Sequence, residues 1–425
     1  RKPITSDNQL VAELKSATKH LANDLQGTSQ LTIEAITGIA DIVESMHSTV
    51  NRLGGLLGQA KNPHRTSGLT GLIYENVRII TRLIGKGIDF PLRELAATRG
   101  ERPSSRQREA TLAALNGVLG DHLYAGENPL AISMQLRSNG LPVDGTGLQE
   151  VIGRSTGRLV LLIHGLCMND LQWTRQGHNH GEALAADLGL APVYLHYNTG
   201  LHISENGRKL AELLERQLEI TLDQAEQKRT GRKKIKELII IGHSMGGLVT
   251  RSACHYGKLA GHRWLKPLRK IVFLGTPHHG APLEKSGNWV ETLLGISPYS
   301  APFARLGKIR SSGVTDLRHS YILDDHWQYH ERFEFTRDLR SPVALPERVA
   351  CYSIATTSAR EGNKIKDHLL GDGLVTLNSA LGVHPKKIDL NLNIPEKNQW
   401  VGRGIHHLDL LCNPQVYETL RAWLA

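Results

Sequence analysis

The chain has 425 residues, 40% of them hydrophobic, so it can bury a sizeable core as one large domain with an addition or as two domains. The formal net charge of +10 raises nucleic acid or an anionic membrane as a partner, but no nucleic-acid motif accompanies the basic residues. No apolar run approaches the ~18 residues of a membrane span, and the chain opens without an apolar leader. We therefore expect a cytoplasmic or peripheral membrane protein without a nucleic-acid partner.

Residues 1–98 have the apolar spacing of helices and show no catalytic motif. Two amphipathic patterns, over residues 10–25 and 31–53, precede a third over residues 73–84. We predict a helical N-terminal domain that packs on the rest of the chain or on a second copy in a homo-oligomer. The alternative is contact with a membrane surface, but the polar faces mix both signs of charge, which favours packing.

The remainder is predicted to be a linker over residues 99–108 and a catalytic domain over residues 109–425. The linker is charged and contains Pro and Ser, and a hairpin with its turn at Asn139-Gly140 follows it. Beyond the hairpin, predicted strands alternate with helical patterns such as the one over residues 206–222. The predicted strands cover residues 159–163, 192–197, 237–241, 271–274 and 349–354. This alternation predicts a mostly parallel central sheet flanked by helices, as in an α/β-hydrolase.

Two further stretches stand out between the predicted strands. The interval from Pro282 to Pro346 is too long for a plain crossover and predicts a cap or lid at about residues 283–347. Basic runs over residues 228–236 and 263–270 precede strands and should lie at the amino ends of the sheet, away from the chemistry. The four cysteines are widely spaced, so neither a disulfide framework nor a zinc site is indicated.

The stretch from Leu238 to Gly247 carries the strongest catalytic signal. A run of apolar, mostly β-branched residues leads into Gly242-His243-Ser244-Met245-Gly246, which fits the G-x-S-x-G turn that places a serine between a strand and a helix. The two glycines are needed because so sharp a turn leaves no room for a Cβ two residues to either side of the serine. Ser244 is the predicted nucleophile.

A serine nucleophile needs a base, and the base needs a carboxylate to orient it. In this fold the acid and then the histidine follow the serine along the chain. Asp372 lies between two glycines after the last predicted long strand and is preferred over Asp367. His407 is preferred as base over the adjacent His406, because neighbouring side chains cannot both face Ser244.

The tetrahedral intermediate of acyl transfer needs two backbone N–H donors for its oxyanion. The amide of Met245, directly after the nucleophile, is one predicted donor. The second is the amide of Leu166, in the loop that follows the first central strand, where Gly165 allows a close backbone approach.

Together these motifs resemble the lipase and GPI inositol-deacylase-like branch of the α/β-hydrolases, including its bacterial serine esterases. The resemblance covers about residues 109–425 and rests on motifs that read IHGL, GHSMGG, GTPHHG, GDGLV and HLDL. It implies a Ser244, Asp372 and His407 triad, an oxyanion hole formed by Leu166 and Met245, and no cofactor or metal. It says nothing of residues 1–98.

The resemblance implies a serine carboxylesterase or lipase that hydrolyses a small-molecule or lipid ester with an apolar acyl group through an acyl-enzyme. Acyl transfer by the same triad is the nearest alternative within enzymes. A different class of interpretation is a membrane-associated interaction protein. In that case the helices of residues 1–98 carry the function and the hydrolase domain is secondary.

Overall fold

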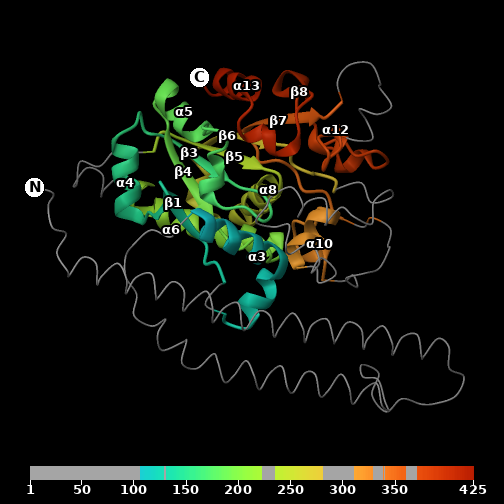
Figure 1. Ribbon diagram of the computed structural model, residues 1–425, viewed down its shortest axis with the longest axis horizontal. Coiled ribbons are helices and arrows are strands. Elements are labelled where there is room, and N and C mark those ends of the chain that lie inside the picture. Colours follow the sequence, from blue (N-terminus) through green and yellow to red (C-terminus); the bar gives the residue numbers. More distant parts are fainter. Residues whose placement is uncertain are drawn as a thin grey trace, which may run out of the picture. The chain divides into compact units, whose positions relative to one another are not determined.

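The computed structural model of the protein describes residues 106–128, 131–222, 235–280, 311–328, 338, 340–359 and 371–425 (Figure 1). The chain divides into two compact units, residues 1–103 with 122–131 and residues 104–121 with 132–425. The second unit contains the predicted catalytic motifs. The helices predicted over residues 1–98 lie outside the described residues.

An eight-stranded sheet in the order β2-β1-β4-β3-β5-β6-β7-β8 forms the centre of this unit. Its strands are β1 Gln135–Ser138, β2 Leu141–Pro142, β3 Arg158–Ile163, β4 Ala191–His196, β5 Glu237–His243, β6 Leu268–Leu274, β7 Ala350–Thr357 and β8 Gln399–Arg403. Strand β1 pairs antiparallel with β2 and β4, and all the other pairs are parallel. The mostly parallel sheet and its antiparallel start confirm the predicted α/β-hydrolase fold class.

Helices cover both faces of the sheet (Figure 1). The α-helices are α3 Arg106–Ala125, α4 Gly145–Gly153, α5 His180–Leu188, α6 Ile203–Leu222, α8 Met245–Leu259, α10 Ser312–His319, α12 Leu377–Ala380 and α13 Pro414–Leu424. Short 3-10 helices are η1 Asp170–Trp173, η2 Arg263–Leu265, η4 Asp324–His326, η5 Ile388–Leu390, η6 Glu396–Asn398 and η7 His407–Leu411. Alternate side chains of β3 and β5, such as Leu162 and Ile241, pack with Leu184 of α5 and Leu420 of α13 in one buried cluster.

The sequence prediction was right at one end of the sheet and wrong at the other. The hairpin was predicted correctly, and its turn residues Asn139 and Gly140 have φ of 52° and 76°, the left-handed conformation that a two-residue hairpin turn requires. Strand β8 was not predicted. Its sequence Gln-Trp-Val-Gly-Arg is short and half exposed and has no apolar run, so only its pairing with β7 makes it a strand.

Two predicted boundaries can be compared with the described residues. Residues 106–108, expected in the linker, belong to the first turn of α3. Helix α10 lies inside the predicted lid, yet most of its residues are buried. The backbone amide and hydroxyl of Ser312 both donate to Asp121, and Asp316 accepts from the amide of Ile203, so this part of the insertion packs on the catalytic unit. Residues 281–310, which include the start of the predicted lid, lie outside the described residues.

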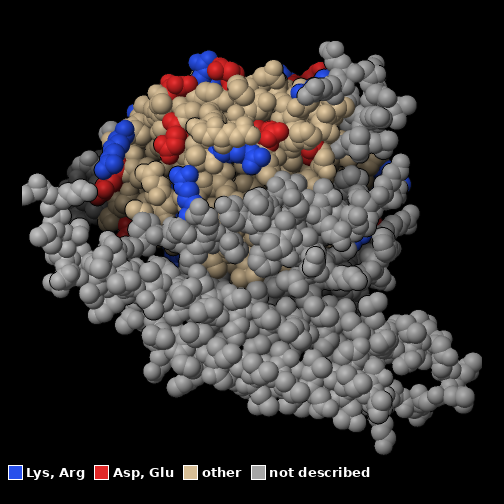
Figure 2. All heavy atoms as spheres, viewed as in Figure 1, with Lys and Arg blue, Asp and Glu red and all other residues tan. Residues whose placement is uncertain are grey.

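Charges of both signs are interspersed on the face of the described residues that Figure 2 shows. The basic run over residues 263–270 makes contacts within the unit, because Arg263 pairs with Glu215 at 2.9 Å and Lys270 donates to the carbonyl of Trp423 at 2.9 Å. None of the helices in the described part of the chain is both long and apolar enough to cross a membrane.

The contact between α6 and α8 depends on a glycine. A Cβ added at Gly207 of α6 would lie 2.1 Å from the hydroxyl oxygen of Ser252 on α8 and 2.9 Å from its carbonyl carbon. The two helices therefore approach too closely for a side chain at this position. A Cβ added at Gly153, in the last turn of α4, would meet no neighbouring atom within 4 Å.

We expect Gly207→Ala to lower the free energy of unfolding by about 1–3 kcal/mol through overpacking. Gly153→Ala is the matched control and should be neutral or stabilising by up to about 1 kcal/mol, because alanine favours the helix. Denaturant unfolding of both variants measures the difference. Equal stability of the two variants would contradict the close helix contact.

Three histidines are buried beside the carboxyl ends of β3 and β5. Burial lowers the pKa of His164 to about 3 and that of His180 to about 4, and it lowers the pKa of His243 well below its usual range. His180 is held at both ring nitrogens, with Nε2 2.8 Å from the carbonyl of Leu410 and Nδ1 2.8 Å from His178. All three are neutral in the folded protein at pH 7.

These lowered pKa values predict acid sensitivity. Below about pH 6.5 the unfolded chain binds protons at these histidines and the folded chain does not, so stability falls as pH falls. Each histidine contributes a slope of about 1.4 kcal/mol per pH unit until its folded pKa is reached. Unfolding free energies between pH 7 and pH 5 should show this slope, and the slope should be smaller in His164→Asn. A slope that is the same in wild type and His164→Asn would contradict this account of His164.

Candidate active site

Ser244 lies at a sharp turn between β5 and α8. Its φ of 52° and ψ of −121° are unusual for a residue with a side chain, and its amide donates to the carbonyl of Leu274 at 2.9 Å. Such strain is typical of a nucleophile elbow, in which the serine is held at the strand end above the sheet. The side chain is 5% exposed.

The glycines that flank Ser244 have the steric role predicted for them. A Cβ at Gly242 would lie 2.6 Å from the amide nitrogen of Gly247, and one at Gly246 would lie 2.2 Å from the carbonyl oxygen of Ile163. Both contacts are with backbone atoms, which cannot move aside easily. The elbow therefore tolerates only glycine at these two positions.

Asp372 and His407 form a buried pair on the loops that follow β7 and β8. Nδ1 of His407 lies 2.7 Å from Oδ2 of Asp372. The other carboxylate oxygen accepts from the amides of Leu374 and Val375 at 3.0 and 2.9 Å, which fixes the aspartate side chain. In addition, the backbone amide of His407 donates to the carbonyl of Asp372 at 3.2 Å, so the two loops are tied together.

The remaining ring nitrogen of His407 has no partner in the described residues. Nε2 is buried, whereas Nδ1 faces Asp372, so the pairing leaves Nε2 available for a proton from another group. The neighbouring His406 is exposed to solvent. Asp367, the alternative acid, lies outside the described residues.

Gly275 connects Ser244 to the histidine and aspartate pair. The amide of Ser244 donates to the carbonyl of Leu274, and Gly275 follows Leu274 in the chain. A Cβ added at Gly275 would lie 3.2 Å from both Oδ2 of Asp372 and Cε1 of His407. The ring of His243, directly before Ser244, has its centroid 4.8 Å from that of His407. The structure thus brings the predicted nucleophile, acid and base to one end of the sheet.

The loop after β3 places Leu166 beside the elbow. A Cβ at Gly165 would lie 3.0 Å from Cβ of Ser244, so the loop backbone touches the serine. Met245 is the first residue of α8, where a helix leaves its N–H groups without intrahelical partners. No hydrogen bond among the described residues uses the amide of Leu166 or Met245. Both predicted donors thus lie next to Ser244 with their N–H groups uncommitted.

Several residues that shape this loop were not predicted from the sequence. Cys167 has φ of 60°, and its amide donates to the hydroxyl of Thr199 at 3.2 Å. The hydroxyl of Tyr197 donates to the carbonyl of His164 at 2.8 Å. Gly275, in the loop after β6, has φ of 56° and lies close to Asp372 and His407. Of these residues, only Gly275 carries a sequence signal, because the others act through contacts distant in the chain.

A buried ion network holds the far end of the same loop. Nη1 of Arg137 on β1 lies 2.9 Å from Glu109 and 3.2 Å from Asp170, the first residue of η1. His196 approaches the same oxygen of Asp170 at 3.0 Å. Burial acts to raise the pKa of Asp170, but the imidazole of His196 and the guanidinium of Arg137 beside it outweigh that effect, so the pKa is lowered. Asp170 therefore remains charged and anchors the loop.

Residues 154–345 match the sequence model of the family described as a PGAP1-like alpha/beta domain. The matched range begins just before β3, includes the elbow and ends before β7, and it spans somewhat less than half of the chain. It therefore includes Ser244 but neither Asp372 nor His407. No curated protein matches the chain.

Similar solved structures include the mature form of a Bacillus licheniformis lipase, 17% identical over 63% of this chain and 91% of that chain, with a TM-score of 0.37. Aspergillus fumigatus lipase B is 10% identical over 93% of this chain and 82% of that chain, with a TM-score of 0.35. Similarity at this level adds nothing to the assignment, which rests on the sheet, the elbow and the family match. On those grounds the chain has the α/β-hydrolase fold, and its residues 154–345 are similar to a PGAP1-like alpha/beta domain.

Proposed function

We propose that the protein is a carboxylic ester hydrolase that acts on esters with an apolar acyl group. Ser244 is the nucleophile, His407 the general base and Asp372 the acid that orients it. The α/β-hydrolase fold supports hydrolase activity in general. The choice of esters and the apolar acyl group follows from the resemblance of the sequence motifs to lipases and esterases.

The observation that carries the proposal is the 2.7 Å contact between His407 and Asp372 beside the strained serine. With Asp372 accepting from Nδ1–H, the neutral ring has its lone pair on Nε2, the atom that is buried without a partner. A base in this tautomer can take the proton of the Ser244 hydroxyl as the oxygen attacks the ester carbonyl. The backbone amides of Leu166 and Met245 then stabilise the negative charge on the carbonyl oxygen.

The same groups complete the reaction. Collapse of the tetrahedral intermediate expels the alcohol, which takes the proton that His407 carries, and leaves an acyl group on Ser244. Water then attacks the acyl-enzyme, His407 accepts a proton from it, and the acid product leaves as the serine regains its proton. Asp372 orients the ring of His407 and stabilises its positive charge in both halves of the reaction.

We expect Ser244→Ala to lower kcat/KM for p-nitrophenyl esters by about 10⁴ or more, because the nucleophile is lost. The measurement uses acyl chains of two to sixteen carbons with the intact protein. Ser133→Ala, which alters an exposed serine, is the control and should retain wild-type rates. Equal rates for wild type and Ser244→Ala would remove Ser244 from the mechanism. A p-nitroanilide series with the same acyl groups distinguishes ester from amide cleavage.

The histidine pair provides a matched test of the base. His407→Ala should lower kcat by about 10⁴ or more, because Nε2 is the proton acceptor, whereas His406→Ala should leave kcat within about threefold of wild type. Circular dichroism and unfolding curves of both variants check that each is folded. The reverse result, with His406→Ala inactive and His407→Ala active, would overturn the assignment of the base.

A further inference from the structure

The short helix η7, His407–Leu411, begins with the proposed base and is only five residues long. The last carbonyl groups of a helix have no partner within it, so contacts from other elements must fix its position. The buried side chain of Leu410 lies beside the proposed acid and base. A Cβ added at Gly275 would lie 2.7 Å from Cδ1 of Leu410 and 3.2 Å from both Oδ2 of Asp372 and Cε1 of His407. A shift of Leu410 would therefore disturb this pair.

The backbone of Leu410 is held by His180, the first residue of α5. Nε2 of His180 lies 2.8 Å from the carbonyl oxygen of Leu410, and the side chain of His180 is fully buried. A carbonyl oxygen can only accept a hydrogen bond, so Nε2 carries the proton. The bond joins two elements that lie 230 positions apart in the chain.

The ring of His180 is fixed on several sides. Burial lowers the pKa of His180 to about 4, so the ring is neutral at pH 7 and carries one proton. With that proton on Nε2, Nδ1 is the acceptor, and Nε2 of His178 donates to it at 2.8 Å. The ring also stacks on Tyr417 of α13, with centroids 5.9 Å apart and 9° between the planes. These contacts keep Nε2 directed at Leu410.

His178 is held in turn by a tight turn. Its amide donates to the carbonyl of Arg175, and its carbonyl accepts from the amide of Arg175, both at 2.9 Å. The two residues between them, Gln176 and Gly177, have φ of 50° and 78°, the left-handed conformation of a two-residue turn. A rigid loop therefore supports the histidine that orients His180.

The first residue of η7 has a second support. Nε2 of His243 lies 3.3 Å from the carbonyl oxygen of His407. His243 is the last residue of β5 and directly precedes Ser244, so this contact links the backbone of the base to the elbow. His180 and His243 thus hold η7 at its fourth and first residues, from two different elements.

We propose that His180 is a positioning residue for the base. Its Nε2–H holds the Leu410 carbonyl and thereby keeps η7 in the place where the ring of His407 pairs with Asp372. Without this donor the buried carbonyl would lose its hydrogen bond, and η7 would shift to reach another donor. A misplacement of about 1 Å can lower a catalytic rate by about 100-fold. The effect on catalysis rests on the proposed function, since it requires His407 to act as the base.

Three substitutions separate the hydrogen bond of His180 from its packing. His180→Gln places an amide nitrogen as many bonds from the backbone as Nε2 of histidine, so it can donate to Leu410. His180→Asn places the amide where Nδ1 lies, too far from that carbonyl. His180→Leu removes the donor and keeps most of the volume.

We expect His180→Leu and His180→Asn to lower kcat for p-nitrophenyl esters by about 10–100-fold, with KM within about threefold of wild type. His180→Gln should keep kcat within about threefold of wild type. A residue that only packs would not separate Gln from Asn in this way. Equal kcat in His180→Asn and His180→Gln would overturn the proposal.

A second readout does not depend on ester hydrolysis. The Nδ1 proton of His407, held in a buried bond to Asp372, gives a strongly deshielded ¹H NMR resonance, which His407→Ala identifies by its loss. The resonance should persist in His180→Gln and be lost or move upfield in His180→Leu and His180→Asn.

An unchanged resonance in His180→Leu and His180→Asn, or its absence from wild type, would overturn the proposal. If wild type hydrolyses no ester, the proposed function fails, whereas the resonance still decides whether His180 positions His407.

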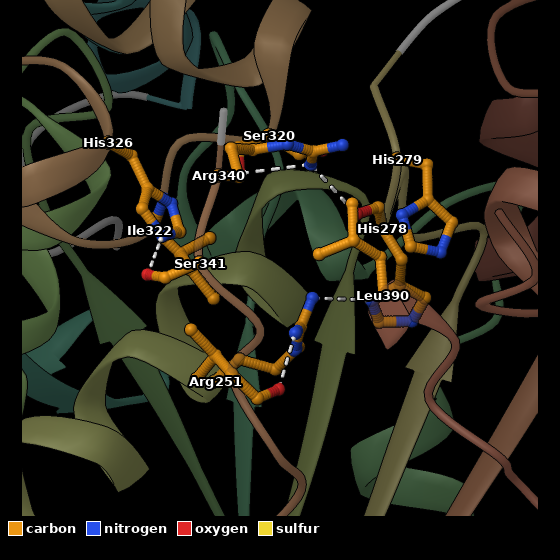
Figure 3. Close-up of a pocket in the computed structure, with 10 residues that line it drawn as sticks. Arg251, His278, His279, Ser320, Ile322, His326, Arg340, Ser341 and Leu390 are labelled. Carbon is orange, nitrogen blue, oxygen red and sulfur yellow. Dashed lines mark hydrogen bonds between the residues drawn. The ribbon is translucent and has the colours of Figure 1, made fainter. Parts of the chain in front are cut away.

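His326→Leu is the matched control. His326 is 4% exposed, and its ring is also bonded at both nitrogens. Nδ1 accepts from the amide of Ile322 at 3.3 Å, and Nε2 lies 3.1 Å from the hydroxyl of Ser341 (Figure 3). These contacts lie in the insertion between β6 and β7 and not at η7. The variant should lose stability but keep the His407 resonance. Loss of the resonance here as well would mean that removal of any buried histidine disturbs the pair, and would overturn the role of His180.

Discussion

The backbone at Ser244 is the constraint on which the rest of the site depends. A residue with φ of 52° and ψ of −121° is costly, and it persists only where its surroundings leave no alternative. Here the carbonyl of Leu274 holds the Ser244 amide, and backbone atoms fill the space beside Gly242 and Gly246. Strands β3, β5 and β6 must be in register for all these contacts to form. The elbow is therefore a product of the whole central sheet.

Sequence reasoning succeeded where local patterns and chain order carry the information. The parallel strands, the hairpin turn at Asn139-Gly140 and the need for glycine beside Ser244 follow from apolar runs and backbone sterics. Asp372 and His407, chosen from chain order and neighbouring residues, lie within hydrogen-bonding distance of each other. That proximity is geometry, and the catalytic roles of the pair stay a proposal.

Other features could not be predicted because they depend on contacts between distant residues. Strand β8 has no pattern of its own and exists through its pairing with β7. Cys167 adopts a left-handed conformation for which its sequence gives no signal, and Thr199 fixes it from another loop. In the sequence Arg251 is an ordinary helix residue, and only the fold shows that it is buried beside His278. The predicted linker extended into residues 106–108, which begin helix α3, because a charged stretch that contains proline can still start a helix.

The proposed nucleophile and the proposed base follow strands at different positions in the sheet. Ser244 follows the central strand β5, which is paired on both sides, whereas His407 follows β8, the last strand of the sheet order. Terminal strands open more readily than central ones, since fewer hydrogen bonds and side chains hold them. Fraying of this edge of the sheet would separate the proposed base, His407, from Ser244 while the centre of the sheet stays intact. Heat inactivation would then be a local and reversible event that precedes global melting.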